Sequence, residues 1–207
     1  MGMKAGTLPV RERLLATADT LFYAEGIHSV GIDRVIAESR VAKSSMYVHF
    51  RTKEDLVEAY LRGRSDRWRT HVAQEVEART QDPLARVLTV FDVFHEAFQD
   101  PGFRGCPFTN AAAEYPHHEG IRAAIADDRA WLPALFTRLL EPLGVGEDSA
   151  LAGALVQLCD GAIAGAHLDR SATSAMTARA TAELLLAARV RNGGDPEAAA
   201  SAGAGSG

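Results

Sequence analysis

The polar side chains best suited to bind a ligand by charge or hydrogen bonds lie together, within residues 43–53 of this 207-residue chain. No nucleophile, acid–base pair or phosphate-binding loop accompanies them. The set fits binding rather than catalysis. Its hydrogen-bond donors and positive charges suit the phosphate oxygens and base edges of a nucleic acid. It comprises two ammonium groups, two hydroxyls, a phenol and an imidazole: Lys43, Ser44, Ser45, Tyr47, His49 and Lys53.

Two short helices and a turn must position this set. Apolar residues recur at helical spacing over residues 32–39 and again over residues 43–50, with a tight turn at residues 40–42. Helices this short are unstable alone, so they must pack on each other and on a third helix, which residues 11–25 supply. This is the helix-turn-helix arrangement, in which the second helix enters the major groove of DNA.

Residues 11–56 resemble the DNA-binding domain of the TetR family of transcriptional regulators. The most specific part is the run Lys-Ser-Ser-Met-Tyr-Val-His-Phe followed by Thr-Lys-Glu-Asp-Leu. The motif covers about a quarter of the chain, and the rest agrees with the family only in length and helical pattern. The residues that carry the resemblance are Ala18, Leu21, Phe22, Gly26, Val41, Lys43, Ser44, Ser45, Tyr47, His49, Phe50, Lys53, Glu54 and Leu56.

The start of the second helix is the predicted contact with double-stranded DNA. Its free N–H groups suit phosphate, and its small side chains allow close approach to bases. Such a run is more often an ordinary solvated helix start, but the surrounding motif favours DNA contact. The predicted contact residues are Arg34, Ala42, Lys43, Ser44, Ser45, Tyr47, His49 and Lys53.

Two positions depart from the family pattern. Arg40 stands in the turn where the family usually has Gly, at a position that tends to need a positive φ. A non-Gly residue there costs on the order of 1 kcal/mol, so Arg40 is either strained or the turn differs. Gly31 replaces the usual Thr or Ser at the helix start and is an acceptable N-cap, while Asp33 suits the helix dipole.

The charge distribution separates the two ends of the chain, whose net charge is −5. Residues 1–70 hold 12 Lys and Arg against 9 Asp and Glu, whereas residues 71–207 hold 10 against 18. Basic character therefore accompanies the helix-turn-helix, although the excess is small. The row of Arg62, Arg64, Arg67 and Arg69 is most simply a solvated helix face.

Helical spacing continues through the remaining sequence and strand signals are nearly absent, which predicts an all-α fold of about nine helices. Residues 53–79 read as one long helix that starts at a Thr52 cap. We expect a three-helix DNA-binding domain at residues 9–52 and a helical bundle for effector binding and dimerisation at residues 53–192. Residues 193–207 are rich in Gly, Ala and Ser and are expected to be disordered.

Residues 148–168 and 173–191 form two helices rich in small and apolar residues. Ala152, Leu155 and Val156 begin a broad apolar stripe on the first. Such a pair could simply close the core of a monomer. In the family that the chain resembles, the last two helices commonly form a four-helix dimer interface, and we favour a homodimer on a pseudo-palindromic operator.

Aromatic residues gather between residues 91 and 136. Each alone is most simply a core residue, but as a group they could line an apolar cavity for a small, largely apolar effector. The candidate ligand-binding residues are Phe91, Phe94, Phe98, Phe108, Asn110, Trp131 and Gln157.

The sequence gives less support to a different kind of sensor or to an enzyme. A redox or metal sensor using Cys106 or the pair His117 and His118 is one alternative, and an all-α enzyme using Glu114 or these histidines is another. Two cysteines make no disulfide framework or zinc motif, so we expect no cofactor or metal and a cytoplasmic location. We also expect no signal region, and no apolar run long enough to span a membrane.

The sequence therefore indicates a dimeric, non-enzymatic transcriptional regulator, more in keeping with a repressor than an activator. An effector would release it from its operator by changing, through the helix at residues 53–79, the spacing of the two recognition helices.

Overall fold

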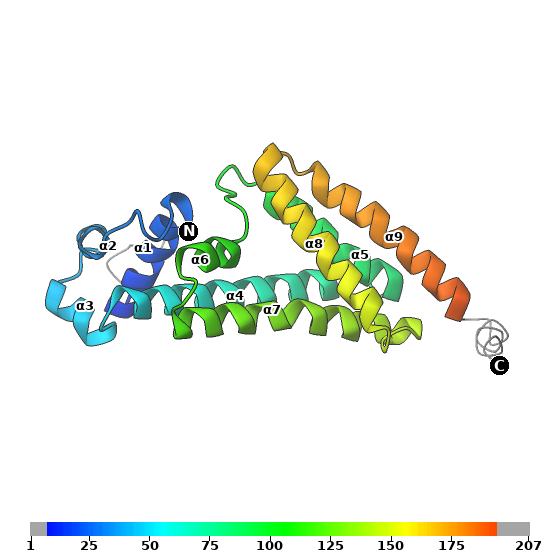
Figure 1. Ribbon diagram of the computed structural model, residues 1–207, viewed down its shortest axis with the longest axis horizontal. Coiled ribbons are helices and arrows are strands. Elements are labelled where there is room, and N and C mark those ends of the chain that lie inside the picture. The colour runs from blue at the N-terminus through cyan, green and yellow to red at the C-terminus, as the bar shows by residue number, and fades with distance from the viewer. Residues whose placement is uncertain (1–7, 194–207) are drawn as a thin grey trace. The chain divides into compact units, whose positions relative to one another are not determined.

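The computed structural model describes residues 8–193, with side chains up to Arg189. This part of the chain holds nine α-helices, one short 3₁₀ helix and no strand, which confirms the all-α prediction (Figure 1). The predicted tail lies outside the described residues, apart from Gly193 at the end of the last helix. The elements are α1 (Val10–Glu25), α2 (Ile32–Ser39), α3 (Lys43–His49), α4 (Lys53–Arg79), α5 (Pro83–Phe98), α6 (Pro107–Glu114), α7 (Glu119–Leu140), η1 (Glu141–Leu143), α8 (Ser149–Asp169) and α9 (Thr173–Gly193).

The chain forms two compact units. Unit 1 combines the residues up to Arg69 with Arg104–Arg129, and unit 2 combines Thr70–Phe103 with the residues from Ala130 onward. Helices α4 and α7 each contribute one segment to either unit. These bounds differ from the functional boundary expected at residues 52 and 53, which remains a prediction.

Unit 1 is built around α1, which packs on α2 and α3. Leu14, Ala18, Leu21 and Phe22 recur at helical spacing and are buried, so one face of α1 supplies the core. Gly26 ends this helix with a φ of 90°, a conformation that favours glycine. Buried residues of the first part of α4, of α6 and of the start of α7 complete the same core.

Unit 2 contains α5, α8 and α9, which pack against one another. The Asp82 side chain accepts the Ala85 N–H at 2.7 Å and so caps α5, with Pro83 in the first turn as predicted. Asp148 caps α8 in the same way through Leu151, at 3.0 Å. Both helix starts are therefore fixed by local hydrogen bonds.

The apolar stripe predicted on α8 closes the core of unit 2. Ala152, Leu155, Val156 and Cys159 are all buried within the single chain. A second face of α8 is exposed instead, and it consists of Gly153, Gln157, Gly161, Ala164 and Leu168. The predicted stripe of α8 is therefore part of the core of the single chain, and a different face of this helix is exposed.

The expectation about membrane-spanning segments was wrong on composition. Ser149–Asp169 is long and apolar enough to pass a test for a membrane span, with a mean hydropathy of 1.4. The core helix of a water-soluble protein passes the same test, and here α8 buries one face against α5 and α9. Its many alanines raise the mean hydropathy because alanine is apolar, and their small size lets the helices pack closely.

Candidate DNA-binding site

The turn between α2 and α3 has the backbone conformation that the family pattern demands. Arg40 adopts φ 56° and ψ 42°, so it takes the left-handed conformation in which glycine is usual. Its N–H donates to the carbonyl oxygens of Ala37 and Ile36, which closes α2. Gly31 is the N-cap of this helix, as predicted. The arginine therefore keeps the turn geometry at the cost of backbone strain.

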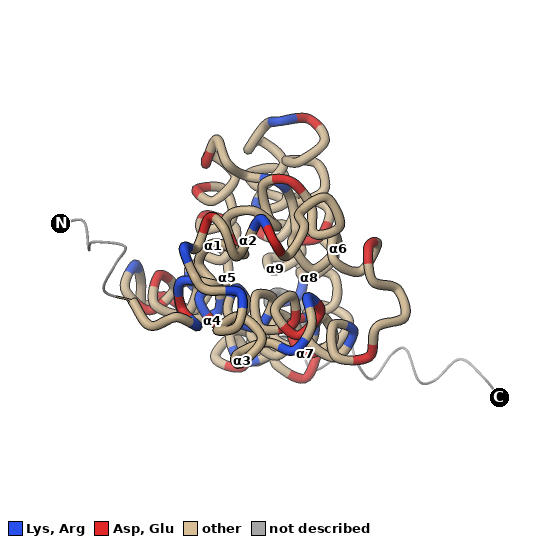
Figure 2. The backbone as a smooth tube through the Cα atoms, turned by 90° about the vertical axis from the view of Figure 1, so that its left-hand side faces the viewer, with Lys and Arg blue, Asp and Glu red and all other residues tan. Residues whose placement is uncertain are grey.

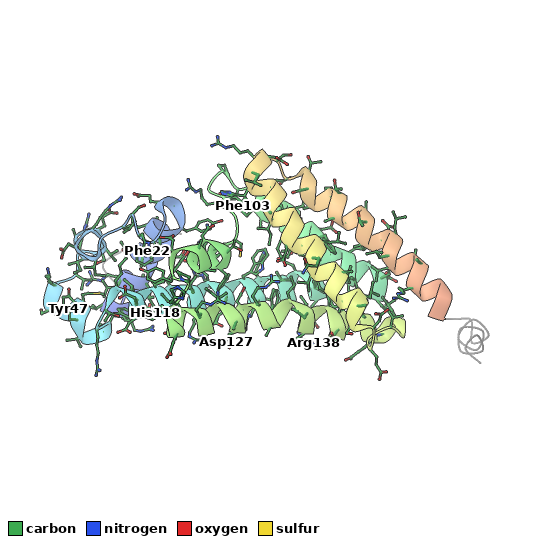
Figure 3. All side chains as sticks on the ribbon, in the orientation of Figure 1. Phe22, Tyr47, Phe103, His118, Asp127 and Arg138 are labelled. Atoms are coloured by element: carbon green, nitrogen blue, oxygen red, sulfur yellow. The ribbon has the colours of Figure 1, made fainter. Side chains whose placement is uncertain are left out.

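Helix α3 is divided into a buried and an exposed face. Met46 is fully buried, and Val41 and Phe50 at the two ends of the helix join the same core. The residues that α3 exposes are Ser44, Tyr47, Val48 and, in its last turn, His49. Tyr47 is labelled on α3 in Figure 3. Polar groups thus stand on the outer side of a helix that the core fixes in place.

The N-terminus of α3 is small and open. Ala42 is the N-cap residue and offers no side-chain acceptor to the first-turn N–H groups. Ser44 and Ser45 follow in the first turn, and of the two Ser44 is exposed and Ser45 half-buried. The arrangement suits close approach by an acceptor such as a phosphate oxygen.

Arg34 is held by two carboxylates of its own domain. Its guanidinium binds Glu25 through two hydrogen bonds of 2.6 and 2.9 Å, and its Nε donates to Glu38 at 2.7 Å. The hydrogen bond to Glu25 is the largest cause that raises the Arg34 pKa above its ordinary value. Because Glu25 ends α1, Arg34 fastens α2 to α1, a role that the sequence did not indicate.

Lys43 and Asp33 form an exposed ion pair, with the Lys43 ammonium 2.8 Å from the carboxylate. The hydrogen bond to Asp33 raises the Lys43 pKa. Both side chains are more than half exposed, and exposed pairs of this kind contribute little stability. Lys43 can therefore exchange Asp33 for a phosphate at small cost.

Lys53 is turned inward. Its ammonium donates to the carbonyl oxygen of Ile27 at 2.6 Å and lies 5.8 Å from the centre of the Phe22 ring. Burial lowers the Lys53 pKa. The start of α4 is instead capped by Thr52 and Asp55, whose side chains accept each other's backbone N–H groups, as the predicted Thr52 cap requires.

The arginine row on α4 is not a purely solvated face, contrary to the sequence-based interpretation. Arg64 and Arg67 approach Asp19 of α1, at 3.6 and 2.8 Å, and Arg64 also stacks 3.7 Å from the centre of the Tyr23 ring. Arg62 and Arg69 reach α7: Arg62 pairs with Asp127, and Arg69 donates to the Asp127 carbonyl and lies 3.9 Å from Asp128. Figure 2 shows basic and acidic residues interspersed along the backbone, as such pairing requires.

Glu114, the last residue of α6, accepts hydrogen bonds from the segment between α1 and α2. Its Oε1 accepts the Ile27 N–H at 3.0 Å, and its Oε2 accepts the His28 N–H. Tyr23 of α1 bonds the segment just before α6 as well, because its hydroxyl donates to the Gly105 carbonyl and accepts the Arg104 N–H. Sequence reasoning missed this role of Glu114, since its partners are 86 and 87 residues away.

The candidate ligand-binding residues divide between the units. Phe91, Phe94 and Phe98 are buried in unit 2, and Trp131 there is half-buried. Phe91 stacks on Phe136 with ring centres 6.0 Å apart, which is core packing. Two candidates belong to unit 1, Phe108 in its core and Asn110 on its surface, and Gln157 lies on the exposed face of α8.

The residues of the sensor alternatives occupy ordinary positions. Cys106 is half-buried at the start of α6 and packs against the unit 1 core. His118 accepts the Ile121 N–H and stands beside Tyr115, while His117 is exposed. Within residues 8–193 no group of three or more His, Cys, Asp or Glu side chains could hold a metal ion.

An all-helical protein with a helix-turn-helix that exposes the polar side of its second helix is a DNA-binding protein by architecture. The sequence profile of the bacterial regulatory proteins of the TetR family matches residues 14–60. A TetR-family transcriptional regulator from Streptomyces coelicolor is 37% identical over 90% of this chain and 96% of its own, with a TM-score of 0.71. The chain belongs to the TetR family and is a helix-turn-helix transcriptional regulator.

Two further solved structures are similar. A TetR-type regulator from Streptomyces avermitilis is 27% identical over 85% of this chain and 99% of its own, with a TM-score of 0.70. The reduced form of NemR from E. coli shares the fold at 24% identity, over 84% of this chain and 94% of its own, with a TM-score of 0.74. None of the curated proteins matches the sequence significantly.

Proposed function

We propose that the protein is a cytoplasmic homodimeric repressor that binds a pseudo-palindromic operator and leaves it when a small, largely apolar effector binds. The observation that carries the DNA contact is that α3 buries Met46 in the core and exposes Ser44, Tyr47 and His49. A helix so fixed can enter the major groove without rearrangement of its own domain.

The DNA contacts that we propose fall into two groups. Ala42, Ser44 and Ser45 approach the base edges, because small side chains at the helix start allow close contact. Lys43, Tyr47 and His49 bind the phosphate backbone. Two of the residues predicted from the sequence have a different part in this proposal. Arg34 and Lys53 hold the helix-turn-helix together through Glu25, Glu38 and the Ile27 carbonyl.

The homodimer would form through the outer faces of α8 and α9. Exposed apolar residues recur along α9 at Met176, Ala180 and Leu184, and the outer face of α8 holds two glycines with open space around them, Gly153 and Gly161. Two such helix pairs can pack closely as a four-helix bundle. A two-fold axis then presents two copies of α3 to successive half-sites.

The effector would act on the aromatic residues of unit 2. An effector shifts the DNA-binding equilibrium only through its different affinity for the bound and released states. Substitution of a residue that lines the effector site should therefore change the response to the effector, but not the operator affinity of the effector-free protein. Trp131, which is half-buried, is the best candidate, because Phe91 is fully buried against Phe136.

A footprint on the DNA upstream of the gene, with light scattering of the free protein, tests the first part of the proposal. We expect a dimer that protects two half-sites about one helical turn apart. A monomer, or no protected region, would contradict it.

For the effector, Trp131→Leu should weaken release selectively, whereas Phe91→Leu should mainly lower the melting temperature. If a thiol-alkylating agent releases the wild type from the operator but does not release Cys106→Ser, Cys106 would instead be the residue that senses the signal.

A further inference from the structure

We infer that Val48 reads the 5-methyl group of a thymine in the major groove and so sets part of the operator specificity. The inference rests on the proposed DNA contact of α3 and names the base chemistry that one further residue of this helix recognises. Val48 was not among the contacts expected from the sequence.

The exposure of Val48 is the first observation. The residue is 81% exposed on α3, more than any other large apolar residue in the part of the chain that the structure describes. Three of the other exposed residues of this kind, Leu168, Met176 and Leu184, lie on α8 and α9, whereas Tyr47 has a hydroxyl that water can solvate. Val48 thus presents a purely apolar surface on the helix-turn-helix.

Position on the helix is the second observation. Ser44 precedes Val48 by four residues and is exposed, so the two side chains are neighbours on the outer face. Met46 lies fully buried on the other side, which fixes this face outward. When α3 enters the groove, Val48 must meet a base edge or a sugar one turn beyond the contacts of Ser44.

The chemistry of the groove decides which base suits Val48. A valine offers no hydrogen bond, so opposite an amino or carbonyl edge it would leave a polar group unpaired. In unmodified DNA, thymine alone presents a methyl group there, and apolar side chains contact it. Valine is also stiff about χ1, so its two methyl groups hold their place without loss of rotamer freedom.

The experiment removes the methyl group alone. Once the footprint has located the operator, each thymine is replaced in turn by deoxyuridine in both half-sites, and binding is measured for the wild type and Val48→Ala. We expect one position at which the wild type loses about fourfold per half-site, the value for one buried methyl-sized group. Val48→Ala should bind the two operators equally well.

A second arm adds the methyl group back in another base. At the same position, 5-methylcytosine should bind the wild type more tightly than cytosine, whereas Val48→Ala should not distinguish them. Tyr47→Phe is the matched control: it should weaken binding but keep the wild-type ratio between thymine and deoxyuridine. Alanine is the better helix former, so Val48→Ala should melt no lower than the wild type.

Two results would overturn the inference while the proposed function stands. One is operator binding by the wild type with no loss at any deoxyuridine position. The other is a loss that persists undiminished in Val48→Ala, since another side chain would then contact the methyl group. Failure of the wild type to bind any specific site would instead contradict the proposed function itself.

Discussion

Two residues expected to touch DNA are bound within the helix-turn-helix itself, and this changes what their substitution should do. Lys53→Ala removes the donor to the Ile27 carbonyl and the cation near Phe22. We expect a loss of about 1 kcal/mol in the free energy of unfolding, the usual value of one such hydrogen bond, measured by urea titration. Unchanged stability with uniformly weaker DNA binding would show that Lys53 is only a phosphate contact.

The residues on the outer face of α3 should separate base reading from positioning. Ser44→Ala should change which operator variants are tolerated, because base contacts carry the sequence information. Tyr47→Phe should weaken binding to all variants alike, within about tenfold. Affinities measured across a panel of single-base operator variants test both expectations. A uniform loss in both variants would refute the division of roles.

At the scale of elements, α6 stabilises the segment between α1 and α2 through Glu114. Glu114→Ala should cost about 2 kcal/mol of stability, since it removes an ionised acceptor from the Ile27 and His28 N–H groups. Glu114→Gln should cost less, because its amide oxygen still accepts one of these bonds. Glu119→Gln, at an exposed carboxylate, is the matched control and should have almost no effect. Equal unfolding free energies for all three variants would contradict this role.

Helices α4 and α7 are joined in unit 1 by the half-buried carboxylate of Asp128. The Ser65 hydroxyl donates to Asp128 at 2.6 Å, and burial raises the pKa of Asp128 above its ordinary value. A raised pKa means that the folded state favours the neutral acid, so the ionised form lowers stability at neutral pH. Asp128→Asn should therefore melt higher than the wild type at pH 7.

The pH dependence gives the control for this prediction. The advantage of Asp128→Asn should shrink as the pH falls and vanish below about 4, where the carboxyl group is protonated in the unfolded chain as well. An advantage that is constant with pH, or a variant that melts lower at pH 7, would mean that the attraction of Arg69, 3.9 Å away, outweighs the cost of burial.

Local signals predicted the elements well, and tertiary partners explain what they missed. The Thr52 cap and the first-turn Pro83 each follow from short-range chemistry, so the sequence predicted them correctly. For Arg40 the family pattern left two alternatives, and its positive φ shows that the residue is strained rather than that the turn differs. The partners of Arg34, Lys53 and Glu114 depend on which distant segments meet, which spacing does not encode. Val48 could have been found, since it stands opposite Met46 in the helical period.

At the scale of the whole molecule, the exposed faces of α8 and α9 should decide the oligomeric state. Leu184 is 72% exposed, and a charge there would be buried without a partner in a four-helix interface. Leu184→Glu should shift the protein to a monomer and weaken operator binding by at least tenfold. Light scattering and operator titration test this. Ala134→Glu, at an exposed site on α7 of the same unit, should stay dimeric, and a dimeric Leu184→Glu would place the interface elsewhere.

The internal pairing of the arginines of α2 and α4 has a consequence for how the protein finds its operator. Each cation that neutralises a phosphate releases a counterion, so affinity normally falls steeply as salt is added. Arg34, Arg62, Arg64 and Arg67 already bind carboxylates of their own chain, and the protein carries a net charge of −5. We expect a shallow dependence on salt and weak retention on other DNA. The search would then proceed mainly by diffusion through solution, with little sliding along the genome.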